Sequence, residues 1–447
     1  MAVFQSRAHR YFVVMRYEQA LLLPALCGVL LGACKKEPGN EAPHISIIAP
    51  AEGASCSVPD TLMITVQASD DIGLAQVAVS LLNQDQIPAG PSASRTVSGK
   101  GISVTLAMPI VSEQLPSGVY TLYATAYDGS LIGNDFRTLH VSAVPLRLRA
   151  VYTVAETGGN TVLYKTDSLG QTNTAASWPM DLGGAAASPG AQMLFVAGGA
   201  QGNFMALSPD GTGVAWQLPN LGSIGAPWFT SVDACADGRV YVGQDNGTLR
   251  GFMAGSGTGT CTATLPDQFR ATRSVTVGDL LICTERHFVT HEERIGIHYR
   301  STGTLQTTQP LDLTPVNLFD RDGGQHLLVF GNRNGQGVVQ DRSIPGGGGW
   351  EPYHWPSPIT AVERVAQGTW LVALASGDLQ RFTFSNAASL SIATTPVLNT
   401  MTYNEMDGSV FGGADGQVVR IDPSTGAVSP AWGVAGNVRK VLPMLNR

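Results

Sequence analysis

Imidazole and carboxylate side chains are the groups that hold divalent metals or act as general bases, and this chain concentrates both in one segment. Histidines at 287, 291 and 298 alternate there with glutamates at 285, 292 and 293. The spacing of His287 and His291 would bring two imidazoles together only on a helix or on one strand face, and it fits no metalloenzyme motif. We therefore interpret the segment as a long solvated loop and predict no metal site.

Aromatic and arginine side chains on loops are the usual anchors of binding surfaces. The chain places such residues between its short apolar segments, and we take them as the candidate binding residues. For Trp350 and Trp355 a second interpretation stays open, in which both simply pack between repeats. The candidates are Trp228, Phe269, Arg270, His287, His291, Arg333, Trp350, Tyr353, His354 and Trp355.

Other chemistry is poorly represented. The sequence contains no GxSxG, Walker or paired-carboxylate pattern, so we predict no catalytic residue and no cofactor. The formal charge is −7, and the body of the chain has no cluster of Lys or Arg. That balance argues against nucleic acid as a partner.

Four cysteines in the body of the chain could be paired or free. An exported chain meets oxidising conditions, which permit disulfides, whereas buried free cysteines would act as small apolar residues. No CxxC spacing occurs, which disfavours zinc. The residues are Cys56, Cys235, Cys261 and Cys283.

The N-terminus has the order of an export signal: Arg7, Arg10 and Arg16, then an apolar stretch that is short for a membrane span and ends at Cys34. The residues LGAC at 31–34 resemble the lipobox of bacterial lipoproteins. This resemblance implies cleavage after residue 33 and lipidation of Cys34. We expect the lipid to anchor the protein in the outer membrane, and both the periplasmic side and the cell-surface side stay open. The chain starts at Met1 or at Met15.

After a polar tether at residues 34–43, six segments of alternating polarity follow, which is typical of a β-sandwich. The runs APHISIIAPAEGAS, VQASDDIGLAQVAVSL and LPSGVYTLYATAYDGS resemble bacterial Ig-like domains, so residues 44–145 are predicted to form one. Asp70, Asp71 and Asp128 could hold Ca²⁺, but we interpret them as turn-forming residues.

The rest of the chain repeats a single pattern: an apolar segment, a Gly/Asp/Asn turn and a second apolar segment. Seven copies recur at intervals of 40 to 47 residues, with room for four strands in each. That period is typical of propeller blades. The first copy lacks a first strand, and residues 437–445 form an extra one at the end. The sequence therefore predicts an all-β chain in which residues 150–447 form a seven-bladed β-propeller closed by the C-terminal strand.

Two of the hairpins, VYVGQDNGTLRGF and VFGGADGQVVRIDPSTGAVSPAW, resemble blades of quinoprotein-type (PQQ-like) propellers. That family's dehydrogenases have adjacent cysteines, a Ca²⁺ ligand set and eight blades. This chain has seven copies and no adjacent cysteines, so the resemblance implies a fold and not an activity.

Together these features predict a non-enzymatic cell-envelope lipoprotein, anchored in the membrane through Cys34, whose propeller binds protein or glycan partners. The alternative is an extracytoplasmic propeller lyase or hydrolase that uses the loop of His287 and His291.

Overall fold

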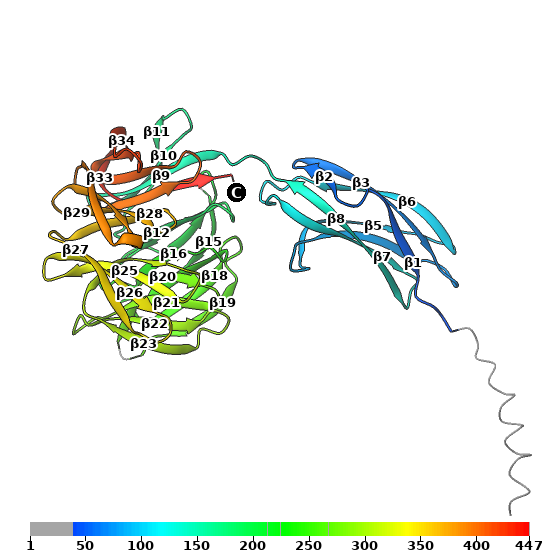
Figure 1. The fold of residues 1–447 in the computed structure, drawn as a ribbon, viewed down its shortest axis with the longest axis horizontal. Helices are drawn as coiled ribbons and strands as arrows, with labels where there is room; N and C mark the ends of the chain where they lie inside the picture. The colour runs from blue at the N-terminus through cyan, green and yellow to red at the C-terminus, as the bar shows by residue number, and fades with distance from the viewer. Residues whose placement is uncertain (1–38, 212, 224, 267, 447) are drawn as a thin grey trace, which may run out of the picture. The chain divides into compact units, whose positions relative to one another are not determined.

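The computed structural model describes residues 39–211, 213–223, 225–266 and 268–446, and almost all regular structure in them is β-strand (Figure 1). Two compact units are present. One comprises the described residues up to Ser112 together with Ser117–Ser142, and the other comprises Glu113–Pro116 together with the chain from Ala143 onward. Within the described ranges, no helix has the length and apolar character needed to span a bilayer.

The first unit is a pair of sheets with alternating buried and exposed residues. One sheet has the order β1-β3-β6 and the other β2-β8-β7-β4-β5, with β2 and β8 parallel. In β6 every second side chain is buried from Val104 to Ile110, as expected where one face of a strand meets a core. The strands are β1 His44–Ala49, β2 Ala54–Ser57, β3 Asp60–Ser69, β4 Gln76–Leu82, β5 Pro88–Thr96, β6 Gly101–Ile110, β7 Gly118–Tyr127 and β8 Ile132–Ser142.

Two of the aspartates considered for Ca²⁺ shape loops in this unit. The carboxylate of Asp70 accepts hydrogen bonds from the backbone N–H groups of Ile72 and Gly73. Asp128 accepts from those of Ser130 and Leu131, and these bonds hold the pKa of its carboxyl at about 2. The interpretation of Asp70 and Asp128 as turn-forming residues is confirmed.

The second unit contains five successive four-stranded antiparallel sheets, each built from strands that follow one another along the chain. This arrangement is propeller-like. The first three sheets are β12 Leu182–Ser188, β13 Met193–Gly198, β14 Phe204–Leu207 and β15 Val214–Leu218; β16 Phe229–Ala234, β17 Arg239–Gln244, β18 Thr248–Met253 and β19 Gly259–Thr264; and β20 Phe269–Val277, β21 Leu280–His287, β22 Glu293–Tyr299 and β23 Leu305–Leu311. The other two are β24 Thr314–Asp320, β25 His326–Arg333, β26 Gln336–Ser343 and β27 Gly349–Trp355; and β28 Ile359–Ala366, β29 Thr369–Leu374, β30 Asp378–Thr383 and β31 Ala388–Thr394. A short 3-10 helix, Phe384–Asn386, joins the last two strands.

A sixth sheet combines the two ends of this unit in the order β11-β10-β9-β34-β33-β32 (Figure 1). The first part of β34 pairs with β33, whereas its last part, from Asn437 to Leu445, pairs antiparallel with β9. The predicted pairing of the C-terminal segment with the first repeat is thus present. The strands are β9 Leu148–Thr157, β10 Asn160–Thr166, β11 Thr172–Trp178, β32 Thr400–Asn404, β33 Ser409–Ile421 and β34 Val428–Leu445.

Apolar side chains pack between neighbouring sheets, so each sheet is buried against the next. One cluster joins Tyr152 of β9, Leu194 of β13 and Leu442 of β34, and another joins Phe330 of β25 with Trp370 of β29. Such packing holds the first strands of all the sheets around one cavity, described below.

The four body cysteines are all free, which settles the open alternative in favour of unpaired residues. Cys56 and Cys283 are buried, while Cys235 and Cys261 are partly exposed. The lipidation residue Cys34 lies outside the described residues.

Candidate functional site

Two of the ten predicted binding residues, Arg270 and His291, line one hollow of about 460 Å³, which we call the face pocket. Its walls come from the starts of β12, β16 and β20 and from the turn between β21 and β22. Because strand starts from three successive sheets converge there, side chains far apart in sequence share one surface. The lining side chains that carry charge or an aromatic ring include Asp181, Phe229, Arg270, Arg286, Phe288 and His291.

The cationic wall of the face pocket is organised around Arg270. Its guanidinium forms an ion pair with Asp245 and lies over the Phe288 ring, 4.5 Å from the centroid. Phe288 itself is 43% exposed and presents its aromatic face to solvent, whereas the Arg270 side chain is 23% exposed and paired with Asp245. Cations and exposed aromatic rings held in one place are suited to anionic groups and to rings of a partner.

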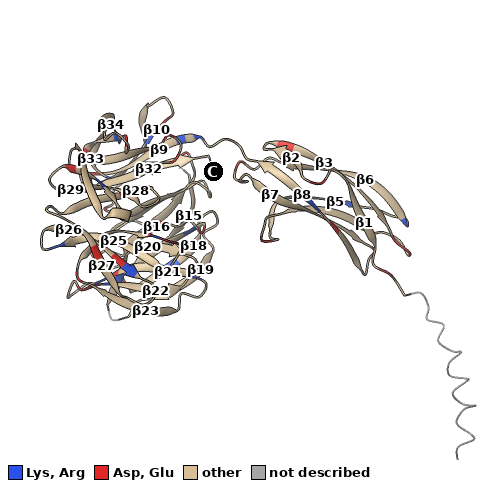
Figure 2. Ribbon diagram, viewed as in Figure 1, with Lys and Arg blue, Asp and Glu red and all other residues tan. Residues whose placement is uncertain are grey.

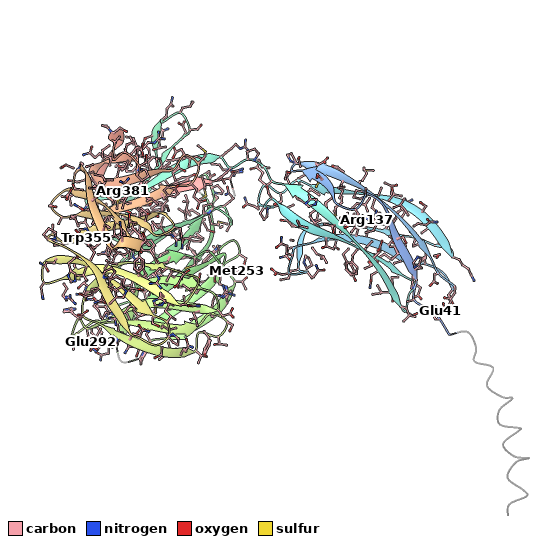
Figure 3. The ribbon with its side chains drawn as sticks, in the orientation of Figure 1. Glu41, Arg137, Met253, Glu292, Trp355 and Arg381 are labelled. Atoms are coloured by element: carbon pink, nitrogen blue, oxygen red, sulfur yellow. The ribbon has the colours of Figure 1, made fainter. Side chains whose placement is uncertain are left out.

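The two histidines predicted for the enzymatic alternative have different positions. The Nδ1 atom of His287 accepts hydrogen bonds from the backbone N–H groups of Val289 and Thr290, at 3.2 and 3.1 Å. His287 therefore shapes the turn. His291 lines the face pocket and is exposed. The labelled Glu292 next to it marks the exposed end of this hairpin (Figure 3).

Trp228 and Phe269 support the pocket from behind. Phe269 is only 4% exposed, packs edge-on against the His287 ring and carries the Arg294 guanidinium 3.5 Å from its centroid. Trp228 packs edge-on against Phe229 and is partly buried. These two residues position the pocket and do not present their rings to a ligand.

The other predicted residues gather on the fourth of the consecutive four-stranded sheets, away from the pocket lining. Arg333 binds Glu351 at 2.7 Å and also Asp312, and His354 binds the same Glu351 carboxylate at 2.9 Å. The Arg333 hydrogen bonds hold the pKa of Glu351 below its usual value. Acidic and basic residues are interleaved near β25 and β27, as Figure 2 shows. Arg333 is thus engaged within the protein.

The expectation that Trp350, Tyr353, His354 and Trp355 lie on a loop is wrong. They lie on strand β27, and Trp355 is 2% exposed, packs against Phe330 and Phe382, and donates its Nε1–H to Ser389 (Figure 3). Tyr353 packs against the same core. Trp350, 53% exposed, and His354, with a side chain 44% exposed, keep accessible rings. For Trp355 the packing interpretation is correct, because burial of its ring stabilises the sheet interface.

Sequence reasoning missed a second feature, a cavity of about 270 Å³ that we call the channel. Seven strands line it: β12, β16, β20, β24, β28, β32 and the end of β34. Its charged lining residues are Asp233, Arg273, Glu363, Arg439 and Lys440. The sequence signal that could have revealed the channel is the presence of charged residues in the otherwise apolar first strands of several sheets.

Two groups in the channel have strongly shifted pKa values. The nearby Arg273 guanidinium, together with burial, lowers the pKa of Lys440 to about 7. Burial raises the pKa of Glu363 to about 7. Arg273 is paired with Asp233 at 3.6 Å, and Arg439 is paired with Glu156 at 2.5 Å. The channel therefore holds a lysine and a glutamate that both change charge near neutral pH.

Comparison with known families confirms the Ig-like prediction. Residues 43–124 match the model of a bacterial Ig domain. The chain matches no curated protein.

Among solved structures, the chain is similar to the WD40 β-propeller domain of Doa1, at 13% identity and a TM-score of 0.48, over 61% of this chain and 88% of that one. It is also similar to BamB from Moraxella catarrhalis, at 17% identity and a TM-score of 0.39, over 58% of this chain and 77% of that one.

Proposed function

We propose that the second unit is a closed seven-bladed β-propeller. Five blades are the consecutive four-stranded sheets. The six-stranded sheet supplies the other two, because β33 and β34 each run through two successive strand segments. Residues 437–445 are then the first strand of the blade that contains β9, β10 and β11. The channel, lined by seven strands, supports a ring of seven.

We propose further that the chain is a lipoprotein of the cell envelope, anchored in the outer membrane through Cys34. The support is the order of basic residues, apolar stretch and LGAC in the first 34 residues. Burial protects the free thiols of Cys56 and Cys283 from oxidants, which is compatible with export.

The propeller is proposed to act without catalysis, as a platform that binds a protein or glycan partner at the face pocket. The observation that carries this proposal is the 460 Å³ hollow in which Arg270, Arg286 and Phe288 converge. A pocket with cationic walls and an exposed ring suits an acidic side chain or an acidic sugar. His287, engaged by two backbone N–H groups, gives no support to the enzymatic alternative.

The platform is tested by partner capture from the native cells. The double variant Arg270→Ala, Phe288→Ala should reduce the recovery of specific partners at least tenfold, because buried aromatic and Arg anchors often contribute about 2 kcal/mol or more each. The control is Leu390→Ala, on the outer strand β31 at 57% exposure. Equal recovery of the same partners by both variants, with both folded, would remove the face pocket from the account.

The anchor is tested by Cys34→Ser. Without a thiol to lipidate, the protein should leave the membrane fraction, and mass spectrometry should find no diacylglyceryl adduct. Wild-type protein whose mature N-terminus lies elsewhere, or carries no lipid, would contradict the proposed location.

A further inference from the structure

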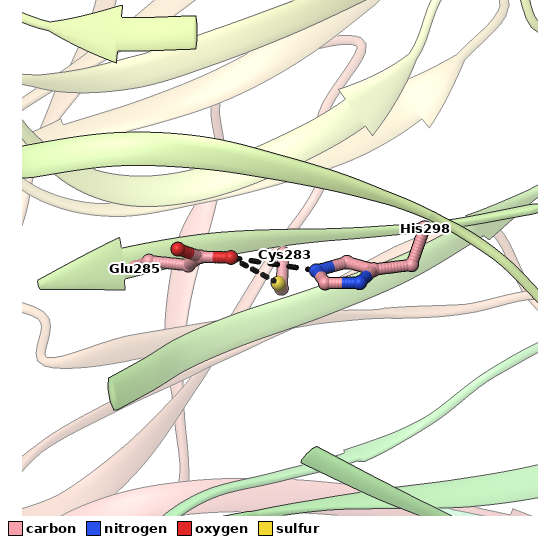
Figure 4. A group of neighbouring side chains, drawn as sticks. All are labelled: Cys283, Glu285 and His298. Carbon is pink, nitrogen blue, oxygen red and sulfur yellow. Dashed lines mark hydrogen bonds and ion pairs between the residues drawn. The ribbon is translucent and has the colours of Figure 1, made fainter. Parts of the chain in front are cut away.

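Outside the face pocket and the channel, one group of chemically reactive side chains lies on the two strands of a hairpin, β21 and β22. Strands β21 and β22 pair so that Cys283 is opposite Gly296 and Glu285 is opposite Arg294. Side chains two residues apart share one face of a strand, so His298 joins them. Cys283, Glu285 and His298 are all 0% exposed, and Figure 4 shows their polar atoms pointing toward one another.

The contact between Glu285 and His298 is long for a charge-assisted hydrogen bond, whereas the contact between Glu285 and Cys283 has an ordinary length for a thiol donor. Glu285 Oε1 lies 3.4 Å from His298 Nε2 and 3.5 Å from Cys283 Sγ, and the three donor atoms lie within 4.8 Å of one another. A charge-assisted N–H···O bond is about 2.7–2.9 Å. Around a tetrahedral Zn²⁺, standard bond lengths place nitrogen and oxygen about 3.4 Å apart and sulfur and oxygen about 3.6 Å apart. The two separations from Glu285 Oε1 match those expected around the ion.

The surroundings of His298 favour a cation at its second nitrogen. Its Nδ1 atom lies 3.2 Å from the Gly303 carbonyl oxygen, which can only accept a hydrogen bond, so Nδ1 carries the hydrogen. In the neutral ring Nε2 then has a lone pair, and it faces a carboxylate. Such a contact needs a proton or a metal ion between the two atoms. A ligating histidine whose other nitrogen is fixed by a backbone carbonyl is usual in metal sites.

The glycine at 296 lets the Glu285 carboxylate lie directly over the backbone of β22. A Cβ there would lie 1.8 Å from Glu285 Oε1 and 2.9 Å from His298 Nε2, so any other residue would displace these two side chains from the cluster. Arg294 Nε binds the other carboxylate oxygen, Oε2, at 2.6 Å and leaves Oε1 to face the cluster.

Charge balance also permits the ion. With no metal, the cluster needs one proton shared by Glu285 and His298 and one on the Cys283 thiol. A divalent ion would replace both protons, so the net charge beside Arg294 would stay the same.

We propose that Cys283, Glu285 and His298 form a zinc site that ties β21 to β22. One thiolate, one imidazole and one carboxylate are the ligand types that Zn²⁺ accepts, and thiolate disfavours Mg²⁺ and Ca²⁺. A water, or a backbone oxygen such as that of Gly296, would fill the fourth coordination position of the ion. The Gly296 oxygen lies 3.8 Å from Cys283 Sγ. Because all three ligands are buried, the ion enters while the chain folds, and its role is structural.

The full chain, purified in detergent, is unfolded with a chelator and refolded with Co²⁺ as a spectroscopic substitute for Zn²⁺. Wild type should bind about one ion per chain and show both a thiolate-to-cobalt charge-transfer band and the strong visible bands of tetrahedral cobalt. Refolding with Zn²⁺ instead should raise the melting temperature.

Cys283→Ser and His298→Gln should lose the charge-transfer band and the bound metal. The matched control, Cys261→Ser, changes a cysteine outside the cluster and should retain both. Wild type that refolds without binding either metal would overturn the proposal and leave a hydrogen-bonded cluster. A charge-transfer band lost in Cys261→Ser would overturn it too. If the Cys283 and His298 variants do not fold, the wild-type cobalt spectrum still decides.

Discussion

At the scale of single residues, Trp350 and Trp355 lie on one strand in opposite environments. The Trp355 ring is buried among Phe330 and Phe382, whereas the Trp350 ring is 53% exposed and its Nε1–H donates to Asp341 at 3.1 Å. Exposure alone therefore separates a core residue from a surface residue.

Replacement of each tryptophan by alanine should show this difference. Trp355→Ala removes a buried ring and should lower the free energy of unfolding by about 3–5 kcal/mol. Trp350→Ala should cost less than about 1 kcal/mol, because Asp341 keeps Arg321 and His326 as partners. Urea denaturation measures both. Similar losses in the two variants would contradict the assigned burial.

The channel makes stability depend on pH. Lys440 has a pKa of about 7 in the folded chain against 10.5 ordinarily, so between these values the unfolded chain binds more protons. The free energy of unfolding therefore rises with pH across this window. Glu363 has a pKa of about 7 in the folded chain against 4.5 ordinarily, so between these values the folded chain binds more protons. Its contribution to the free energy of unfolding therefore falls from pH 4.5 to 7.

Lys440→Met should abolish the rise between pH 7 and pH 10.5, and Glu363→Gln should abolish the fall below pH 7. Urea denaturation of wild type and both variants across pH 4.5 to 10.5 measures these slopes. Variants whose pH profiles run parallel to the wild-type profile would show that the two groups titrate normally.

Part of the residue-level site could be predicted from sequence. Two residues predicted to bind a partner, Arg270 on strand β20 and His291 in the turn after β21, line the face pocket. Proximity in sequence failed for His298, which lies apart from His287 because it pairs with Leu281, six residues before His287 along β21. Alternation along β21 places Cys283 and Glu285 on one face of the strand. The register of the hairpin, which the sequence did not give, adds His298 to that face.

At the scale of elements, period-2 alternation predicted most strands of the Ig-like unit, and two were missed. Strand β5, PAGPSASRT, contains two prolines and pairs only with β4, where an edge position tolerates residues that cannot donate to a ladder. Strand β2 has only four residues. In the second unit the turns were found more easily than β27, whose residues 349–355 contain a proline.

The pairing of 437–445 with β9 predicts the result of a truncation. Val438, Val441 and Met444 are fully buried. Loss of residues 437–447 should therefore lower the free energy of unfolding by more than about 5 kcal/mol. Thermal unfolding measures the loss. A peptide with the sequence of 437–447 should restore the melting temperature of the truncated chain, and a scrambled peptide should not. A truncated chain that melts like wild type would argue against a closed ring.

At the scale of the whole molecule, the repeat of 40 to 47 residues predicted the propeller-like fold, whereas no residue pattern predicted a partner. Repeats report architecture because each copy must bury its faces against its neighbours. A partner leaves no such period, since its contacts come from a few side chains on different loops. Under the proposed function, the choice of partner would therefore depend on side chains such as those of the face pocket and not on the fold.

The central claim is that the face pocket touches the partner, and site-specific photo-crosslinking in the native cells tests it most directly. A photoreactive amino acid at Phe288 should give one dominant crosslinked product, and the same group at Leu390 on β31 should not. A product from Leu390 but not from Phe288, with both proteins folded and lipidated, would contradict the account.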